Sequence, residues 1–356
     1  MTIGILADSL YTDHPSSYLN KLIISNLQKQ NPEMPLVFIF RQSKKKTDWN
    51  TGNIAKAYRK QPLVRFPTTA KAQERALKKL VSEHQVDVLL VLDVKDISSI
   101  SIPQYLILHG MEGFEASKLK PLKQVSGILA TSKLLITQLI KTGYPAEKLF
   151  LEERLASSAF ENCSYDTKLA VREKYTSSKQ FFISTGFDIS PADLVFLLKA
   201  YSLFKQRLQS SWFLVIVART SKNKSELDQL VASYKYRADV VVLFEPDEET
   251  LAALTAAAYC FLNVSSAGVF QVSVLEALQC GVPAICVPTS GIHFFETAVV
   301  VTEEKTPEVF AESMMELYKD EVGHHQLAER GSEFLKKTEV REDIPAFFQA
   351  VLSGQS

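Results

Sequence analysis

A single carboxylate, that of Glu276, stands in a long uncharged stretch of the sequence. It is the only charged residue between Glu249 and Glu296, and it lies in a segment, Val272 to Gln279, whose apolar residues have helical spacing. A lone helical glutamate is most often on the solvated face. If the helix instead follows a strand of a parallel sheet, its first turn lies at the carboxyl edge, where ligands bind. The free N–H groups there suit a phosphate, and a carboxylate one turn further along could accept hydrogen bonds from sugar hydroxyls.

The residues on both sides of this helix predict the elements that would position Glu276. Tyr259 to Val264 is an apolar run of strand character, and a Gly-containing loop separates it from the helix. Gly281 is suited to end the helix, and Pro283 prevents its continuation. Ala284 to Val287 is a second buried strand. The segment therefore predicts a strand–loop–helix–strand unit of a parallel sheet.

Two further side chains follow predicted strands. His109 comes directly after the apolar strand Tyr105 to Leu108, and Arg219 comes after the strand Trp212 to Ala218. A lone histidine is usually a hydrogen-bonded structural residue, and an arginine after a strand is usually a solvated loop charge. Their places at strand ends also suit contact with a ligand, and both interpretations stay open.

Composition limits the class of protein. A chain of 356 residues, 46% of them hydrophobic, predicts two domains with their own cores. Lysine and arginine together equal aspartate and glutamate, which argues against a broad electrostatic surface for nucleic acid. The four cysteines have no metal-ligand spacing, and the first residues have no basic start typical of a signal peptide. We therefore expect a cytoplasmic protein that holds no metal.

Strands alternate with helices along the whole chain, which predicts parallel sheets covered by helices. A polar, charged segment from about residue 161 to residue 178 interrupts this alternation. We therefore expect an α/β protein of two doubly wound domains. The first spans residues 1–160 and is joined by a C-terminal helix over residues 343–356, and the second spans residues 161–342.

The run Leu278-Gln279-Cys280-Gly281-Val282-Pro283-Ala284-Ile285, together with Glu276, resembles the nucleotide-sugar site of the GT-B glycosyltransferases, and in particular the retaining group called family 4. The resemblance is clear from about Gln180 to Lys319 and diffuse over the first half. It implies two Rossmann-like domains that face a cleft. The donor nucleotide would bind the second domain and the acceptor the first, and Glu276 would hold the donor ribose.

The sequence departs from the family at several donor-site positions. Gly268 stands where the family has the first of its two glutamates, of which Glu276 matches the second, and Phe187 and Ala192 stand where it has the arginine and lysine that neutralise the diphosphate. Fixed cations normally stabilise the charge that develops on a leaving diphosphate. The family's Gly-Phe-Gly loop is replaced by Val269, Phe270 and Gln271.

The resemblance also implies roles for other residues. His109 matches a cleft histidine near the donor sugar, and Ser290 and Gly291 match a loop whose backbone N–H groups contact the donor. Arg219, with backbone N–H groups of Val269 to Ser273, could replace the missing cations. The candidate donor-binding residues are therefore Glu276, Arg219, Gly268, Val269, Phe270, Gln271, Ser290 and Gly291, with His109 as the candidate catalytic residue.

These residues favour a glycosyltransferase that transfers a sugar from a nucleotide sugar to a glycan or lipid-linked acceptor. If active, it would retain anomeric configuration and need no metal or cofactor, as the resemblance implies. The missing cations and glutamate favour an alternative, a catalytically silent GT-B protein that acts as a binding partner in a glycan pathway. A GT-B sugar-nucleotide epimerase is a third reading, without a supporting set of carboxylates. The basic stretch Arg41, Lys44, Lys45 and Lys46, with Trp49, could make a weak peripheral membrane contact.

Overall fold

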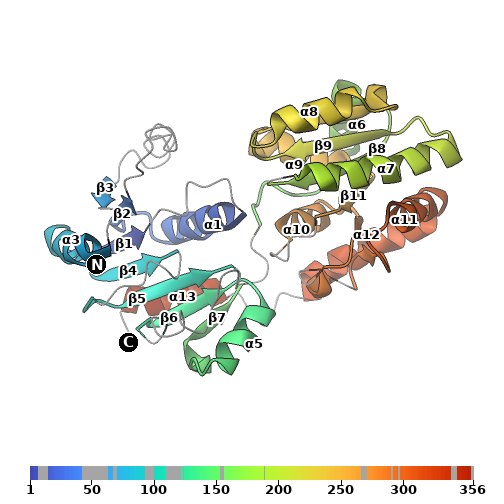
Figure 1. Cartoon of the computed structure of the whole chain (residues 1–356). Coiled ribbons are helices and arrows are strands. Elements are labelled where there is room, and N and C mark those ends of the chain that lie inside the picture. The colour runs from blue at the N-terminus through green and yellow to red at the C-terminus, as the bar shows by residue number, and fades with distance from the viewer. Residues whose placement is uncertain are drawn as a thin grey trace. The chain divides into compact units, whose positions relative to one another are not determined.

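The computed structural model divides the chain into two units (Figure 1). Unit 1 comprises Met1–Leu155 and Arg341–Ser356, and unit 2 comprises Ala156–Val340. The division falls a few residues earlier in the chain than the sequence pattern suggested. The structure describes residues 1–6, 15–41, 63–66, 70–92, 100–109, 122, 124–152, 156–187, 189–265, 271–289, 292–295, 297–337 and 343–353.

The described strands of unit 1 form a seven-stranded parallel sheet in the order β3-β2-β1-β4-β5-β6-β7. Its strands are apolar runs, and the side chains of β1, β4, β5 and β6 are buried throughout. This is the pattern of a sheet covered on both faces. The strands are β1 Ile3–Leu6, β2 Leu36–Arg41, β3 Leu63–Phe66, β4 Val88–Val91, β5 Gln104–Leu108, β6 Gly127–Ala130 and β7 Leu149–Leu151.

Helices from both ends of unit 1 cover this sheet. They are α1 Pro15–Gln30, α3 Ala70–Glu83, α5 Lys133–Lys141, the short 3-10 helix η4 Ala146–Lys148, and the C-terminal α13 Asp343–Ser353. In Figure 1, α13 lies against the sheet of unit 1 although its colour marks the end of the chain. The Tyr105 hydroxyl donates to the Ala350 carbonyl at 2.8 Å, and the Phe347 ring packs edge-on against Tyr105 and Phe150. The last helix is therefore part of the core of unit 1.

Unit 2 contains a six-stranded parallel sheet in the order β10-β9-β8-β11-β12-β13. The chain runs outward from β8 to β10 and then returns to the other side of β8 with β11. The sheet therefore has its topological switch point between β8 and β11. The strands are β8 Phe181–Gly186, β9 Phe213–Ala218, β10 Val240–Phe244, β11 Cys260–Asn263, β12 Ala284–Cys286 and β13 Val300–Val301.

The helices of unit 2 begin and end at residues whose chemistry explains the boundary. Side-chain oxygens of Ser164, Ser190, Asp247 and Thr306 accept backbone N–H groups at the starts of α6, α7, α9 and α11. Gly281, with φ of +70°, follows α10 as predicted. The helices are α6 Tyr165–Thr176, α7 Pro191–Leu208, α8 Lys224–Ala232, η5 Arg237–Asp239, α9 Glu248–Ala257, α10 Val272–Gln279, η6 His293–Phe295, α11 Pro307–Lys319 and α12 Glu321–Lys337.

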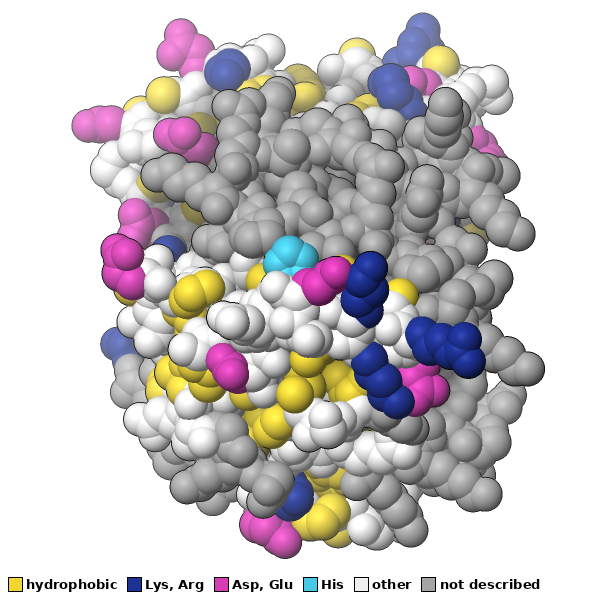
Figure 2. All heavy atoms as spheres, turned by 90° about the vertical axis from the view of Figure 1, so that its left-hand side faces the viewer, with side chains coloured by type: hydrophobic (Ala, Val, Ile, Leu, Met, Phe, Trp, Pro, Cys, Tyr) yellow, Lys and Arg dark blue, Asp and Glu magenta, His cyan; other side chains and the backbone are white. Residues whose placement is uncertain are grey.

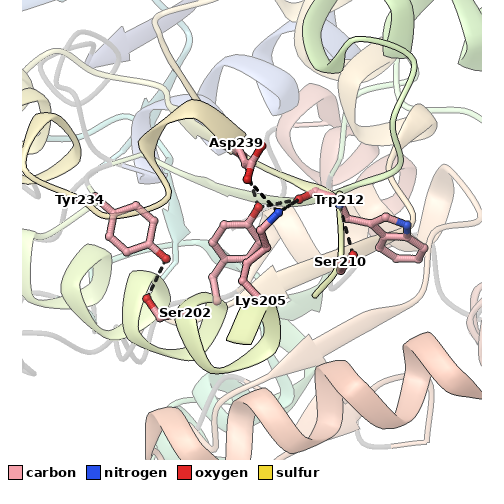
Figure 3. A network of polar contacts seen from close by, with 7 residues as sticks. Ser202, Lys205, Ser210, Trp212, Tyr234 and Asp239 are labelled. Atoms are coloured by element: carbon pink, nitrogen blue, oxygen red, sulfur yellow. Dashed lines mark hydrogen bonds and ion pairs between the residues drawn. The ribbon is translucent and has the colours of Figure 1, made fainter. Parts of the chain in front are cut away.

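A polar network ties α7 to the amino ends of β9 and β10 (Figure 3). The buried ammonium of Lys205 contacts the Asp239 carboxylate at 2.8 Å, and the Tyr201 hydroxyl donates to the Trp212 carbonyl at 2.6 Å. Ser202 and Tyr234 share a hydrogen bond of 2.9 Å beside them. Because Trp212 and Asp239 precede their strands, this network lies at the sheet edge opposite the carboxyl ends. The network stabilises the fold and does not take part in the edge of the sheet where ligands are expected to bind.

The structure confirms the predicted fold class of two parallel-sheet, Rossmann-like domains. It adds the edge strand β3, which the sequence pattern did not predict. On the face seen in Figure 2, basic and acidic side chains lie interspersed among the described residues, in keeping with the zero formal charge. None of the described helices is both long and apolar enough to cross a bilayer. The basic stretch with Trp49 lies outside the described residues, apart from the backbone of Arg41.

Candidate functional site

Glu276 is buried inside unit 2. It lies in the second turn of α10, which follows β11, and its side chain is 1% exposed. The solvated-face interpretation of this residue is therefore wrong. Val274, Leu275 and Leu278 of the same helix are also buried, so an ionised carboxylate at this place requires a partner.

Arg219 provides that partner. It directly follows β9, and its backbone N–H continues the ladder by donating to the Gly186 carbonyl at 2.8 Å. Its side chain is 10% exposed, and a terminal guanidinium nitrogen donates to a carboxylate oxygen of Glu276. Arg219 is therefore not a solvated loop charge. The pair joins the carboxyl end of β9 to the helix after β11 at the switch point of the sheet.

Two aromatic rings enclose the Arg219 guanidinium. The ring centre of Phe187 lies 4.6 Å from its central carbon, and that of Phe160 lies 5.8 Å away. A guanidinium over a ring face is attracted by the quadrupole of the ring. Phe187 stands at the position where the resemblance places an arginine. Its ring instead packs against the guanidinium of Arg219, which follows β9.

Ala192 stands where the resemblance places a lysine, and a lysine from another part of the chain lies close to it in the structure. Ala192 lies in the first turn of α7, and the ammonium of Lys305 contacts the carboxylate of the adjacent Asp193 at 2.9 Å. The Ser190 hydroxyl also donates to Asp193 at 2.8 Å. No sequence signal marks Lys305, because it precedes α11 and reaches α7 only through packing. Both charges near the missing cation positions are thus paired with carboxylates.

The thiol after the site helix is chemically inert. Burial, with a smaller contribution from the nearby Glu276 carboxylate, raises the pKa of Cys280 to about 12. A thiol with a raised pKa has little of the reactive thiolate form at neutral pH. Among the described residues, no group of three or more His, Cys, Asp or Glu side chains could hold a metal ion.

His109 belongs to unit 1 and not to this group. It follows β5, is 6% exposed, and its Nε2 lies 2.8 Å from the Asn20 side-chain oxygen on α1. This hydrogen bond orients the ring. Of the remaining candidates, Gln271 directly precedes α10 and is buried. Gly268, Val269, Phe270, Ser290 and Gly291 lie outside the described residues.

The chain is similar to known proteins. Residues 171–334 match the family described as Glycosyl transferases group 1. This segment makes up a little less than half of the chain. It includes Arg219, Glu276 and nearly all of unit 2.

Individual proteins are also similar to this chain. An O-antigen chain mannosyltransferase B from Escherichia coli is 27% identical over 193 residues, which cover 54% of this chain and 51% of that protein. The chain thus spans about half the length of this relative. HepE from Anabaena in complex with UDP-glucose is similar in structure, with a TM-score of 0.75, 17% identity, and coverage of 99% and 98% of the two chains. WaaG, a glycosyltransferase involved in lipopolysaccharide biosynthesis, has a TM-score of 0.67, 11% identity and coverage of 99% and 98%. The chain therefore has the GT-B fold.

Proposed function

We propose that this protein is a glycosyltransferase that transfers a sugar from a nucleotide sugar to a glycan or lipid-linked acceptor. The observation that carries the proposal is the buried carboxylate of Glu276 in the helix after β11, at the switch point of a sheet that lies within the segment similar to group 1 glycosyltransferases. The resemblance gives this residue contact with the donor ribose. The similar HepE structure holds UDP-glucose, which supports a nucleotide sugar as ligand.

The Arg219–Glu276 pair supports this role in two ways. A guanidinium carries five N–H donors, so Arg219 can keep its bond to Glu276 and still donate to a phosphate oxygen. The bond also orients the Glu276 side chain, and carboxylate oxygens are acceptors suited to ribose hydroxyls. We propose that Arg219 contacts the diphosphate together with backbone N–H groups near the start of α10.

Calorimetric titration tests the donor site directly. The parent protein should bind UDP or GDP, and Glu276→Gln should weaken that affinity by about 10- to 100-fold, as expected for lost charged hydrogen bonds. Arg219→Ala should weaken the nucleoside diphosphate more than the nucleoside. Glu316→Gln, on an exposed face of α11, is the matched control and should bind as the parent does. Equal affinity in the parent and in Glu276→Gln would contradict the assignment.

A second function has its own supporting observation. Among the described residues, Arg219 and Lys305 are both paired with carboxylates, so neither offers an uncompensated positive charge to a leaving diphosphate. This favours the catalytically silent binding partner over an enzyme. Donor hydrolysis separates the two proposals: turnover in the parent that Glu276→Gln reduces identifies an enzyme, whereas nucleotide binding without turnover favours the silent protein. For an enzyme we expect unchanged turnover in EDTA, because the proposed chemistry uses no metal.

A further inference from the structure

The carboxyl edge of the unit 2 sheet carries more acidic than basic residues. Its parallel strands all end at this edge, and the loops that follow them form the region where ligands bind. Among the described residues of the loops after β8 to β13, the basic ones are Arg219, Lys222 and Lys305, and the acidic ones are Glu245, Asp247, Glu303 and Glu304. The residues of these loops that the structure does not describe add no lysine or arginine. The edge is therefore poorly suited to a highly charged anion.

Two of the three basic side chains are paired with carboxylates. A guanidinium N–H of Arg219 donates to Glu276, and the Lys305 ammonium contacts Asp193 at 2.9 Å. The third, Lys222, is exposed, and water and salt weaken the attraction of an exposed lysine for an anion. Within the described part of unit 2, this edge therefore offers a ligand no cation that is both shielded from water and uncompensated.

Neutral rings pack against the Arg219 guanidinium. The ring centre of Phe187 lies 4.6 Å from its central carbon, and that of Phe160 lies 5.8 Å away. The rings shield the cation from water, which strengthens its contacts, but they add no charge of their own. The helix N-termini at this edge, those of α7 and α10, each contribute a positive end of only about half an elementary charge. Together these groups suit an anion of modest charge.

A nucleotide sugar and the free nucleoside diphosphate differ in charge. Both phosphates of the nucleotide sugar are esterified on each side, so each keeps one ionised oxygen and the diphosphate carries about −2. The free diphosphate ends in a terminal phosphate whose second proton dissociates near pH 6, so it carries about −3 at pH 8. At this edge the additional charge gains no further cation and is repelled by the acidic residues.

We propose that the donor site of unit 2 selects a nucleotide sugar over the free nucleoside diphosphate by charge. This inference rests on the proposed function and specifies its ligand class, a diphosphate that is esterified at both ends. The preference serves both functions considered above. An enzyme would release the free diphosphate readily after transfer, and a silent binding protein would respond to the donor while free nucleotide competes weakly.

A methyl ester separates the effect of charge from contacts with the sugar. Calorimetry on the full-length protein at pH 8 and low salt compares UDP with its β-methyl ester, which lacks one ionised oxygen, and GDP with the corresponding ester. Ala192→Lys adds a cation at an exposed position in the first turn of α7. Ala192→Gln adds a long side chain without charge. Gln206→Lys adds the same charge at an exposed position in the last turn of the same helix, away from the ligand edge.

We expect the parent to bind each methyl ester about 5- to 10-fold more tightly than the free diphosphate, the effect of one uncompensated charge near the protein surface. Ala192→Lys should tighten binding of the free diphosphate about 5- to 10-fold and of the ester by less, so that the preference largely disappears. Ala192→Gln and Gln206→Lys should keep the preference of the parent. Added salt should reduce the preference in the parent, because it screens the repulsion.

Three results would overturn the inference and leave the donor site standing. One is a parent that binds UDP or GDP at least as tightly as the methyl ester. Another is a preference that Ala192→Lys leaves unchanged, and the third is one that Gln206→Lys removes to the same extent, since the charge would then not act at this edge. Absence of binding of every nucleotide and ester defeats the proposed function, and the inference with it.

Discussion

The guanidinium of Arg219 lies 4.6 Å from the ring centre of Phe187, at the position where related proteins are expected to carry a cation of their own. The charge at this edge of the sheet comes from the end of β9 and is bonded to Glu276 on α10. Arg219 therefore neutralises a buried carboxylate, and we have proposed that it also contacts the diphosphate. Its substitution should affect stability as well as binding.

Arg219→Ala should destabilise the protein by about 3–5 kcal/mol at neutral pH, because it leaves the Glu276 carboxylate buried without its cation. Urea unfolding at neutral pH measures the loss. The double variant Arg219→Ala/Glu276→Gln should recover part of the stability, and a double variant no more stable than Arg219→Ala would argue against a direct pairing.

The Lys205–Asp239 pair offers a stability test far from the ligand edge. Asp239→Ala should cost about 3 kcal/mol, because the Lys205 ammonium, with a side chain only 7% exposed, loses its counterion. The control is Asp228→Ala, which breaks the exposed pair of Asp228 with Lys224 within α8 and should change stability by about 0.5 kcal/mol or less. Equal effects in the two variants would show that burial of the ammonium is unimportant. Nucleotide binding should stay the same in both.

His324 makes the stability of unit 2 sensitive to acid. It stacks on Tyr259 at 3.9 Å between ring centres, and its Nε2 bonds the Tyr259 carbonyl at 2.8 Å. Burial lowers the pKa of His324 below 6.5, opposed in part by the Tyr259 carbonyl, while His325, Lys168 and Glu321 contribute smaller effects. Below about pH 6.5 the unfolded chain therefore binds a proton that the folded protein does not, so stability falls as pH falls.

The variant His324→Gln isolates that effect. Glutamine can donate to the Tyr259 carbonyl but does not titrate, so the decline in unfolding free energy between pH 7 and pH 5 should become shallower. The exposed neighbour His325, which pairs with Glu329 at 3.3 Å, gives the control His325→Gln, which should keep the slope of the parent. A slope unchanged in His324→Gln would refute the prediction.

The four cysteines should differ sharply in reactivity. Burial raises the pKa of Cys260 and Cys286, and it raises that of Cys280 to about 12, whereas Cys163 is half-buried. Ellman's reagent should therefore react with one thiol equivalent in the native protein and with four after denaturation. Cys163→Ser should abolish the native reaction. A second fast thiol in the native state would show that unit 2 opens around α10 or the sheet.

The sequence predicted the helices and central strands because their apolar residues repeat with clear periods. The strand β3 escaped prediction because it is four residues long, lies at the sheet edge and stands between Pro62 and Pro67. At the start of α5, the Ser132 side chain caps the helix by accepting the N–H of Leu135.

The sequence identified Glu276 and Arg219 as candidate residues but did not predict that they form an ion pair. Glu276 was identified because a lone charge in an apolar segment is conspicuous. Its partner Arg219 is 57 positions away, and Asn20 is 89 positions from His109. Such contacts depend on the strand order, which local periodicity does not determine. The roles of these residues in binding remain predictions.

The position of α13 affects how the protein is made. Unit 1 includes residues before Leu155 and after Arg341, so the whole of unit 2 is synthesised between the two parts of one core. At about 5–20 residues per second, the ribosome needs roughly 10–40 s to cover that interval. During this time the aromatic surface that later receives Phe347 has no cover, while unit 2 can already fold. A chain that lacks only its last helix would therefore carry a folded unit 2 attached to a unit 1 that is prone to aggregate.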